Sequence, residues 1–365
     1  MKNNTKYKVV SIVMIIFFFG LSLFSWFKPA TEFSDSERRN LAKFPTVSFN
    51  NIISGKFMKD FETYSTEQFP LRDSFRTLKA LTNLYILNRT DNNGLFVKDG
   101  YIGKIEYPLN EKSVSDAARK FKAVSDKYFK GTDVKTYFSV IPDKNYYLIE
   151  EDYLSIDYEK MFSQIQKETQ FMEYIDIKDL LTLESFYKTD THWRQEKILP
   201  VAKKLAKKMG VDLKAEYEEK LLENDFYGVY HGQSALPLTP EEIKYLTNDI
   251  LENVKVFNYE AQKEMTVYDM GKAFGKDPYE MFLSGSLSLL SIENEKATTN
   301  KELVIFRDSF GSSLAPLLAE GYKKITVVDI RYIQPDMLGN FIEFTNQDVL
   351  FIYSTSVLNN SETIK

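Results

Sequence analysis

The longest apolar stretch of the sequence is an almost unbroken hydrophobic run from Val9 to Phe27. A helix of this length covers roughly 28 Å at about 1.5 Å per residue, close to the ~30 Å hydrocarbon core of a bilayer. Three lysines within the first eight residues precede the run, which favours a cytoplasmic N-terminus. We therefore predict that residues 1–28 form a cytoplasmic tip and a transmembrane signal anchor, with the rest of the chain outside the cytoplasm.

A cleaved signal peptide is the alternative interpretation of this run. Signal peptides usually have a shorter apolar region that ends at small residues, whereas this run ends at Phe27-Lys28-Pro29-Ala30. An uncleaved single-pass anchor explains this exit better. Residues 29–50 are polar and mixed in charge, and we interpret them as a tether to a folded domain over residues 51–365.

From about residue 110 onward, short apolar runs alternate with segments of helical spacing. The apolar runs predict buried strands over residues 136–141, 173–177, 303–306, 325–329 and 349–353. Helical spacing predicts helices near residues 110–128, 158–171, 198–209, 310–320 and 335–345. Short apolar runs separated by helices indicate an α/β fold, with a mostly parallel sheet covered by helices on both faces.

Residues 212–300 break this rhythm. They contain several glycine turns and the second histidine of the chain, in His231-Gly232-Gln233. We interpret the segment as an insertion or cap over the sheet and not as a separate domain.

The composition narrows the possible chemistry. The chain of 365 residues has no cysteine, which excludes disulfides, thiol nucleophiles and thiolate metal sites. It has two histidines, too few for a three-histidine zinc site. Its net charge of −5, without a long basic block, gives no reason to expect nucleic acid. No metal and no cofactor is expected.

One histidine stands two residues after a carboxylate, within the stretch 187–193. In an extended segment residues i and i+2 point to the same side, so Asp190 could reach one ring nitrogen of His192 and leave the other free as a base. Ser309 follows the apolar run 303–306, and ligands collect beyond the carboxyl ends of parallel strands. Together these stretches predict an Asp190–His192–Ser309 nucleophilic triad.

The helix expected after Ser309 would add free backbone N–H groups and the positive end of its dipole, which an oxyanion needs. A purely structural interpretation is also open. Asp308 and Ser309 belong to the residue types that commonly cap helices, and a histidine beside a tryptophan can be a structural residue. Asp308 is also a rival of Asp190 for contact with His192.

The motifs of the chain extend well beyond these two stretches. They comprise Ser36-Glu37-Arg38-Arg39-Asn40-Leu41 with Pro45, Ser54-Gly55-Lys56-Phe57, Phe69-Pro70-Leu71-Arg72-Asp73, Val140-Ile141-Pro142-Asp143-Lys144, Tyr187 through Trp193, Arg307-Asp308-Ser309-Phe310 and Val328-Asp329-Ile330-Arg331. As a set, over residues 31–355, they resemble the DHHW family and, more distantly, the alginate O-acetyltransferases with an SGNH-hydrolase-like fold.

The resemblance implies an SGNH-hydrolase-like domain in which Asp190, His192 and Ser309 are catalytic. It further implies an O-acetyltransferase that modifies an extracytoplasmic polysaccharide through an acyl-serine, with a membrane-bound O-acyltransferase as the partner that supplies the acetyl groups. The sequence departs from the family pattern at Thr191, where the namesake motif has its first histidine, and at Arg307, where the pattern has glycine. A carbohydrate esterase with the same triad and a non-catalytic envelope or glycan-binding scaffold are the alternatives.

Six further residues are candidates for substrate contacts. They flank the motifs or lie in the expected cap, and they are Lys144, Asn145, Arg307, Tyr227, Tyr230 and His231. The tyrosines could stack on sugar rings. His231 is a loop histidine with no carboxylate next to it in the sequence, and such residues are more often structural.

Overall fold

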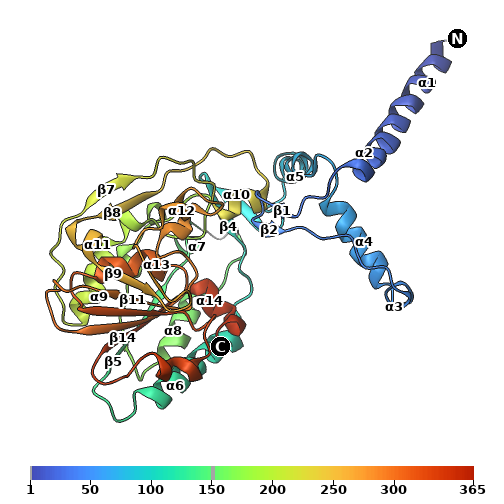
Figure 1. Ribbon diagram of the computed structural model, residues 1–365. Coiled ribbons are helices and arrows are strands. Elements are labelled where there is room, and N and C mark those ends of the chain that lie inside the picture. Colours follow the sequence, from blue (N-terminus) through green and yellow to red (C-terminus); the bar gives the residue numbers. More distant parts are fainter. Residues whose placement is uncertain (1, 149–152) are drawn as a thin grey trace. The chain divides into compact units, whose positions relative to one another are not determined.

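A computed structural model describes residues 2–148 and 153–365, which form two compact units (Figure 1). The first unit comprises Met1–Asn93 and His231–Leu238, and the second comprises Gly94–Tyr230 and Thr239–Lys365. The tether over residues 29–50 and the helices that follow it therefore belong to the same unit. The division of the chain lies at residues 93 and 94, later than the expected domain start at residue 51.

The first unit begins with a continuous helical segment formed by α1 (Lys2–Ile15), η1 (Ile16–Gly20) and α2 (Leu21–Phe27). Its stretch Thr5–Phe27 is long and apolar enough to cross a membrane, and none of its most apolar part is buried against the protein. The remaining elements of this unit are β1 (Phe33–Ser34), β2 (Arg39–Asn40), α3 (Phe49–Ile53), α4 (Lys56–Glu67), α5 (Arg72–Leu81) and η2 (Thr82–Ile86).

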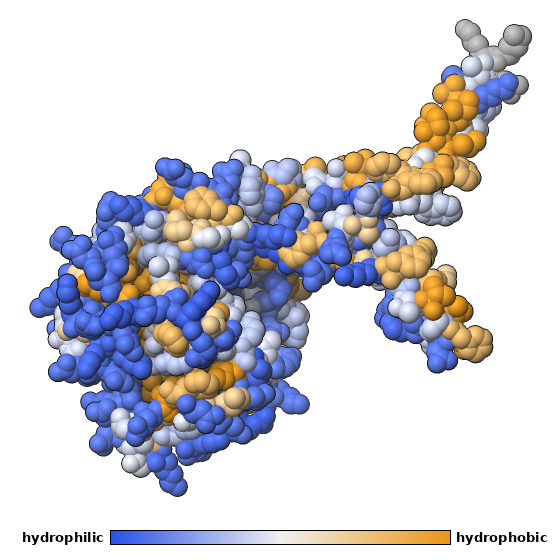
Figure 2. All heavy atoms as spheres, in the orientation of Figure 1, coloured by the Kyte–Doolittle hydropathy of each residue, from blue (hydrophilic) through white to orange (hydrophobic). Residues whose placement is uncertain are grey.

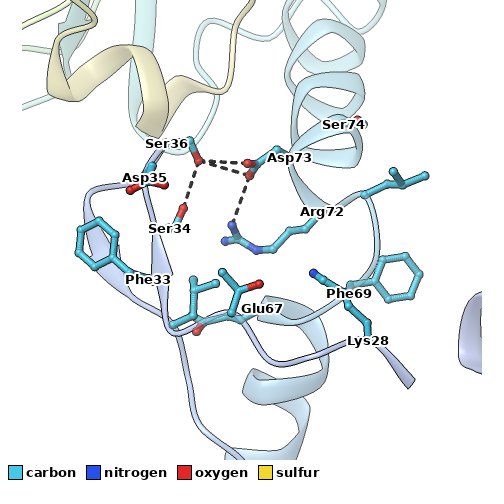
Figure 3. A pocket seen from close by; sticks show the side chains of 13 residues that line it. Lys28, Phe33, Ser34, Asp35, Ser36, Glu67, Phe69, Arg72, Asp73 and Ser74 are labelled. Atoms are coloured by element: carbon cyan, nitrogen blue, oxygen red, sulfur yellow. Dashed lines mark hydrogen bonds and ion pairs between the residues drawn. The ribbon is translucent and has the colours of Figure 1, made fainter. Parts of the chain in front are cut away.

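Polar contacts hold the first unit together around the Ser36–Leu41 motif. The carboxylate of Glu37 lies 2.6 Å from the guanidinium of Arg72, and the guanidinium groups of Arg39 and Arg76 also contact it. The Ser36 hydroxyl donates to both carboxylate oxygens of Asp73 at 3.3 Å, beside the pocket drawn in Figure 3. These contacts give the family-like motif a structural role in this unit.

The second unit is built on an eight-stranded sheet within the described residues, in the order β10-β9-β11-β13-β12-β14-β5-β6. Its strands are β5 (Lys135–Ile141), β6 (Glu173–Tyr174), β9 (Lys255–Asn258), β10 (Lys263–Met265), β11 (Leu289–Glu293), β12 (Glu302–Arg307), β13 (Lys324–Val328) and β14 (Asp348–Ser354). The neighbours from β13 to β6 pair in parallel, and the β10–β9–β11 edge pairs antiparallel. The predicted α/β class with a mostly parallel sheet is confirmed.

Helices cover both faces of this sheet. Leu303 and Ile305 of β12 belong to the core cluster that includes α9 (Leu199–Lys208). The alternate residues Val304 and Phe306 belong to the second cluster, which includes α6 (Glu111–Tyr128) and α8 (Tyr158–Glu168). Because successive side chains of a strand point to opposite faces, α9 lies on one face and α6 and α8 on the other.

The remaining elements of the second unit are short. They are β3 (Leu95–Lys98), β4 (Tyr101–Lys104), α7 (Asn145–Leu148), η3 (Lys178–Leu180), η4 (Leu183–Ser185), η5 (Gln195–Lys197), β7 (Glu218–Leu221), β8 (Lys244–Thr247), α11 (Asp249–Asn253), α12 (Met270–Ala273), η6 (Pro278–Met281), α13 (Gly311–Leu314), η7 (Ala315–Leu318), η8 (Pro335–Asn340), α14 (Thr355–Asn359) and η9 (Ser361–Thr363). Helix α10 (Val229–Ser234) contains residues of both units.

The structure differs from the expected elements in three places. The helix predicted over residues 310–320 is the single turn α13 followed by the 3-10 turn η7, because Pro316 lacks the N–H that an α-helix needs there. The helix predicted over 335–345 is the 3-10 turn η8. Within the expected cap, the strands β9, β10 and β11 join the central sheet, so only the rest of residues 212–300 lies outside it.

Candidate active site

The side chains of Asp190, His192 and Ser309 form one hydrogen-bonded chain in the second unit. The Nδ1 atom of His192 lies 2.6 Å from Oδ1 of Asp190, and its Nε2 atom lies 2.7 Å from Oγ of Ser309. Asp190 is buried, whereas His192 and Ser309 are partly exposed. Of the three side chains, the carboxylate is therefore the one that is shielded from water.

A tight turn, and not an extended segment, brings Asp190 to His192. Oδ1 of Asp190 also accepts the backbone N–H of His192 at 3.0 Å, and Oδ2 accepts the backbone N–H of Val229 at 2.8 Å. Burial raises the pKa of Asp190, but the attraction of His192 and these hydrogen bonds outweigh it and hold the pKa well below its usual range. The carboxylate is thus ionised and fixed in orientation.

Ser309 stands at the corner after β12. Its neighbour Asp308 accepts the N–H of Phe310 at 3.1 Å and the N–H of Ser354, at the end of β14, at 2.7 Å. Both carboxylate oxygens of Asp308 thus tie the corner to the backbone, and Asp190 is the carboxylate that contacts His192. Since α13 is a single turn, the expected long helix with its dipole is not present behind Ser309.

Tyr279 stacks on the face of the His192 imidazole, a contact that the sequence did not suggest. Its ring stacks on His192 with the centroids 3.9 Å apart and the planes 10° apart. Its hydroxyl lies 2.9 Å from Oγ of Ser313, which in turn accepts the indole N–H of Trp193 at 2.8 Å. Burial raises the pKa of Tyr279, so it stays a neutral phenol. The stack fixes the plane of the ring.

Lys144 holds the turn that carries Asp190. Its ammonium donates to the carbonyl oxygens of Tyr187 at 2.9 Å, Lys188 at 3.0 Å and Asp190 at 2.7 Å. Burial lowers the pKa of Lys144 to about 7, and nearby carboxylates, Asp190 first among them, oppose that shift. Only 2% of the residue is exposed. These contacts give Lys144 a positioning role, and its contact with a substrate at the small pocket stays a prediction.

Two residues of the 212–300 segment hold the same turn from another side. Oε1 of Glu241 accepts the backbone N–H of Thr189 at 2.7 Å and its hydroxyl at 2.6 Å, and Oε2 accepts the N–H of Lys188 at 2.6 Å. At Gly228 a Cβ atom would lie 2.3 Å from the carbonyl carbon of Thr189. Only glycine permits this close approach of the two backbones.

The other substrate-contact candidates fall into two groups. Asn145 and Tyr230 line a small pocket together with Lys144, whereas Arg307, Tyr227 and His231 do not line it. Asn145 is buried and donates to the carbonyl oxygen of Lys104 at 2.6 Å, and Arg307 is buried in an ion pair with Asp329 at 3.4 Å. The Arg307 side chain is fully buried and offers no surface to a substrate, whereas Asn145 stays a candidate at the small pocket.

The two tyrosines and the second histidine have different surroundings. The ring of Tyr230 is partly buried, with the Lys144 ammonium 5.0 Å from its centroid, whereas Tyr227 is 42% exposed. His231 belongs to the first unit. In the described residues, no group of three or more histidine, aspartate or glutamate side chains is arranged to hold a metal ion.

The chain is similar to known proteins in its three-dimensional structure and not in a detectable sequence match. No family model matches the sequence, and no curated protein matches it. A crystal structure of a DHHW family protein from Eubacterium siraeum aligns with 75% of this chain and 95% of that chain, at 21% identity and a TM-score of 0.60. The chain has the fold of a DHHW family protein.

Two further solved structures align with most of this chain. Bacillus cereus PatB1 with a sulfonyl adduct aligns with 72% of this chain and 97% of that chain, at 17% identity and a TM-score of 0.56. The O-acetyltransferase domain of Pseudomonas putida AlgJ aligns with 73% of this chain and 92% of that chain, at 11% identity and a TM-score of 0.45. At 17% identity, the likeness to PatB1 establishes the fold alone.

Proposed function

We propose that the second unit is an extracytoplasmic O-acetyltransferase that uses Ser309 as its nucleophile. The observation that carries the proposal is the 2.7 Å contact between Nε2 of His192 and Oγ of Ser309, in a chain that ends at a buried, ionised Asp190. Nucleophile, base and orienting carboxylate in hydrogen-bond reach of one another are the arrangement that activates a serine hydroxyl.

The reaction proceeds in two half-reactions. Nε2 of His192 takes the proton of the Ser309 hydroxyl as Oγ attacks the carbonyl carbon of an acyl donor, and His192 then gives this proton to the leaving group. A sugar hydroxyl, deprotonated by His192, attacks the resulting acyl-serine, and the proton returns to Ser309 as the ester is released. Asp190 stabilises the imidazolium in both steps.

The resemblance to the DHHW family and the apolar N-terminal helix support the substrate and the location. The span within residues 9–27 anchors the chain as a single-pass protein, and the folded part lies outside the cytoplasm, where acetyl-CoA is not available. A membrane-bound O-acyltransferase therefore supplies the acetyl group, and a cell-surface or secreted polysaccharide accepts it.

The detergent-solubilised full chain, incubated with a chromogenic acetyl ester with and without an oligosaccharide, tests this proposal. We expect faster ester turnover with the acceptor and the appearance of acetylated sugar, both lost in Ser309→Ala. Turnover that the acceptor does not change would identify a carbohydrate esterase with the same triad, because water is then the acceptor. Equal absence of turnover in the folded wild type and in Ser309→Ala would favour a non-catalytic glycan-binding scaffold.

A further inference from the structure

The first unit exposes a set of large apolar side chains around α3 and α4. Phe49, Ile53 and Met58 are 76%, 70% and 64% exposed, and Figure 2 shows the apolar colouring gathered over this part of the chain. The full set, here named the α3–α4 surface, is Phe44, Val47, Phe49, Ile52, Ile53, Met58 and Phe61. Exposed apolar residues that gather in this way mark an interaction surface, whereas single ones do not.

The helix α4 is amphipathic and presents one side to this surface. Phe57, Phe61 and Tyr64 follow the i, i+4, i+7 spacing of one helix face, and the ring of Phe44 packs against all three. The opposite face carries polar residues at the same spacing, among them Lys59, Thr63 and Thr66. A helix of this kind fits an apolar phase on one side and water on the other.

A short stretch of chain and a side-chain contact connect the end of the apolar span to the end of α4, so a membrane crossed by this span is the apolar environment close to α4. Thr31 lies four residues beyond Phe27, where α2 ends. Its backbone N–H donates to the side-chain oxygen of Gln68 at 2.8 Å, and its carbonyl oxygen accepts from the side-chain nitrogen of Gln68 at 2.8 Å. Gln68 is buried and directly follows α4. Four extended residues reach at most about 14 Å and the contact through the Gln68 side chain adds several Å, so the C-terminal end of α4 lies within about 20 Å of the end of the apolar span. The α3–α4 surface begins there and extends along α4, whose 12 residues cover about 18 Å.

We propose that the α3–α4 surface lies in the headgroup region of the membrane that the N-terminal helix crosses. The apolar side chains point into the acyl boundary and the polar face of α4 points to water. Amphipathic helices bind bilayers in this way by burying their apolar face about 5–10 Å deep. This inference rests on the membrane anchor of the proposed function, and it adds a second point of attachment that holds the first unit against the bilayer.

Single-cysteine labelling of the full chain tests this inference without background, because the natural sequence contains no cysteine. Ile53→Cys places a nitroxide spin label on the α3–α4 surface, Thr63→Cys places one on the polar face of α4, and Phe19→Cys places one in the apolar span. The labelled chains are reconstituted in phosphatidylcholine–phosphatidylglycerol vesicles. The collision rates of each label with oxygen, which concentrates in lipid, and with a water-soluble nickel chelate are then measured.

We expect an oxygen-to-nickel collision ratio that is several-fold higher at positions 53 and 19 than at position 63. Equal ratios at 53 and 63, with a lipid-like ratio at 19, would overturn the inference and leave the anchor intact. Low collision rates with both reagents at position 53 would also overturn it, because a protein partner or a second copy then covers the surface. A water-like ratio at position 19 would contradict the anchor itself. Unchanged circular dichroism of each labelled chain shows that it is folded.

Discussion

The contact between Ser309 and His192 joins two positions that are 117 residues apart, and it depends on side chains outside both motifs. Asp190 fixes one ring nitrogen of the imidazole and Tyr279 fixes the plane of the ring. Lys144 fixes the backbone turn that supplies the carboxylate. The placement of the imidazole beside the Ser309 hydroxyl is therefore a property of this group of residues and not of the Asp-Ser pair alone.

Asp190→Asn should lower kcat for ester turnover on the order of 10³- to 10⁴-fold, because an amide neither stabilises the imidazolium nor selects the correct tautomer.

The same variant tests the low pKa of Asp190. An aspartate whose folded-state pKa is depressed stabilises the protein above its unfolded pKa, about 3.9, and this stability is lost as the pH falls through the folded-state value. The difference in unfolding free energy between wild type and variant, measured by urea titration, should be full at pH 7 and shrink below about pH 4. A difference that is independent of pH would contradict this assignment.

Lys144→Met should lower kcat on the order of 10²-fold with little change in KM, because a misplaced turn misorients Asp190 and hence His192. Unfolded lysine has a pKa of about 10.4 and folded Lys144 a pKa of about 7, so the unfolded chain binds the proton more tightly between these values. Wild-type stability should therefore gain from Lys144 as the pH rises from 7 to about 10, and the methionine variant should lack this gain. Lys203→Met, at an exposed lysine of α9, is the matched control and should leave kcat unchanged. Equal kcat in the two variants would refute the positioning role.

At the scale of elements, the parallel strands present their ends to one edge of the sheet, where Ser309 lies. Asp308 joins the corner after β12 to the end of β14 through the N–H of Ser354. Arg307, the last residue of β12, is buried beside it and paired with Asp329, one residue beyond β13. Arg307, which stands where the family pattern has glycine, is thus buried next to the corner after β12. The His192–Ser309 contact is formed although the glycine is replaced.

Asp329→Asn should destabilise the second unit by about 3–5 kcal/mol, because it leaves the Arg307 charge buried without its partner and also weakens the two-point contact of Asp329 with Arg331. Thermal unfolding of the variant, followed by circular dichroism, measures this change. Asp126→Asn is the control, since its partner Lys122 lies on an exposed helix surface and such pairs contribute about 1 kcal/mol or less. An equal, small effect in both variants would show that the buried pair contributes little.

The strands that the sequence predicted are those with strong apolar runs, such as 303–306 and 349–353, because a strand buried on both faces needs apolar residues throughout. The sheet edge formed by β9 and β10 escaped prediction, since Lys255–Asn258 and Lys263–Met265 are short and carry charged residues. The prediction of a long helix after Ser309 was wrong, because Pro316 interrupts the helix there.

The residues of the candidate site also divide into those that the sequence indicated and those that it did not. Asp190 and His192 could be paired from local spacing, and Ser309 could be placed at a strand end. Tyr279 and Glu241 could not be found, because their contacts with this turn and ring cross long sequence distances and leave no periodic pattern. Lys144 was noticed in a motif, but its burial, and hence its role, depends on the folded chain.

At the scale of the whole chain, the apolar helical stretch Thr5–Phe27 is long and apolar enough to cross a membrane. If it is an uncleaved anchor, the full-length chain should remain in the membrane fraction after washing with high salt and alkaline carbonate, and detergent should release it. A cleaved signal peptide would instead yield a shorter chain, starting after residue 27, in the soluble extracytoplasmic fraction. Intact mass and immunoblotting of the two fractions distinguish the outcomes.

The reactivity of Ser309 toward a sulfonyl fluoride tests the central claim most directly. A sulfonyl adduct has been seen on PatB1, which shares this fold. Peptide mass spectrometry of the treated full chain should find the adduct on Ser309, and His192→Ala should slow its formation by about 10²- to 10⁴-fold while the chain stays folded. A folded wild type that is not labelled at Ser309, or that is labelled there just as fast in His192→Ala, would contradict the catalytic triad.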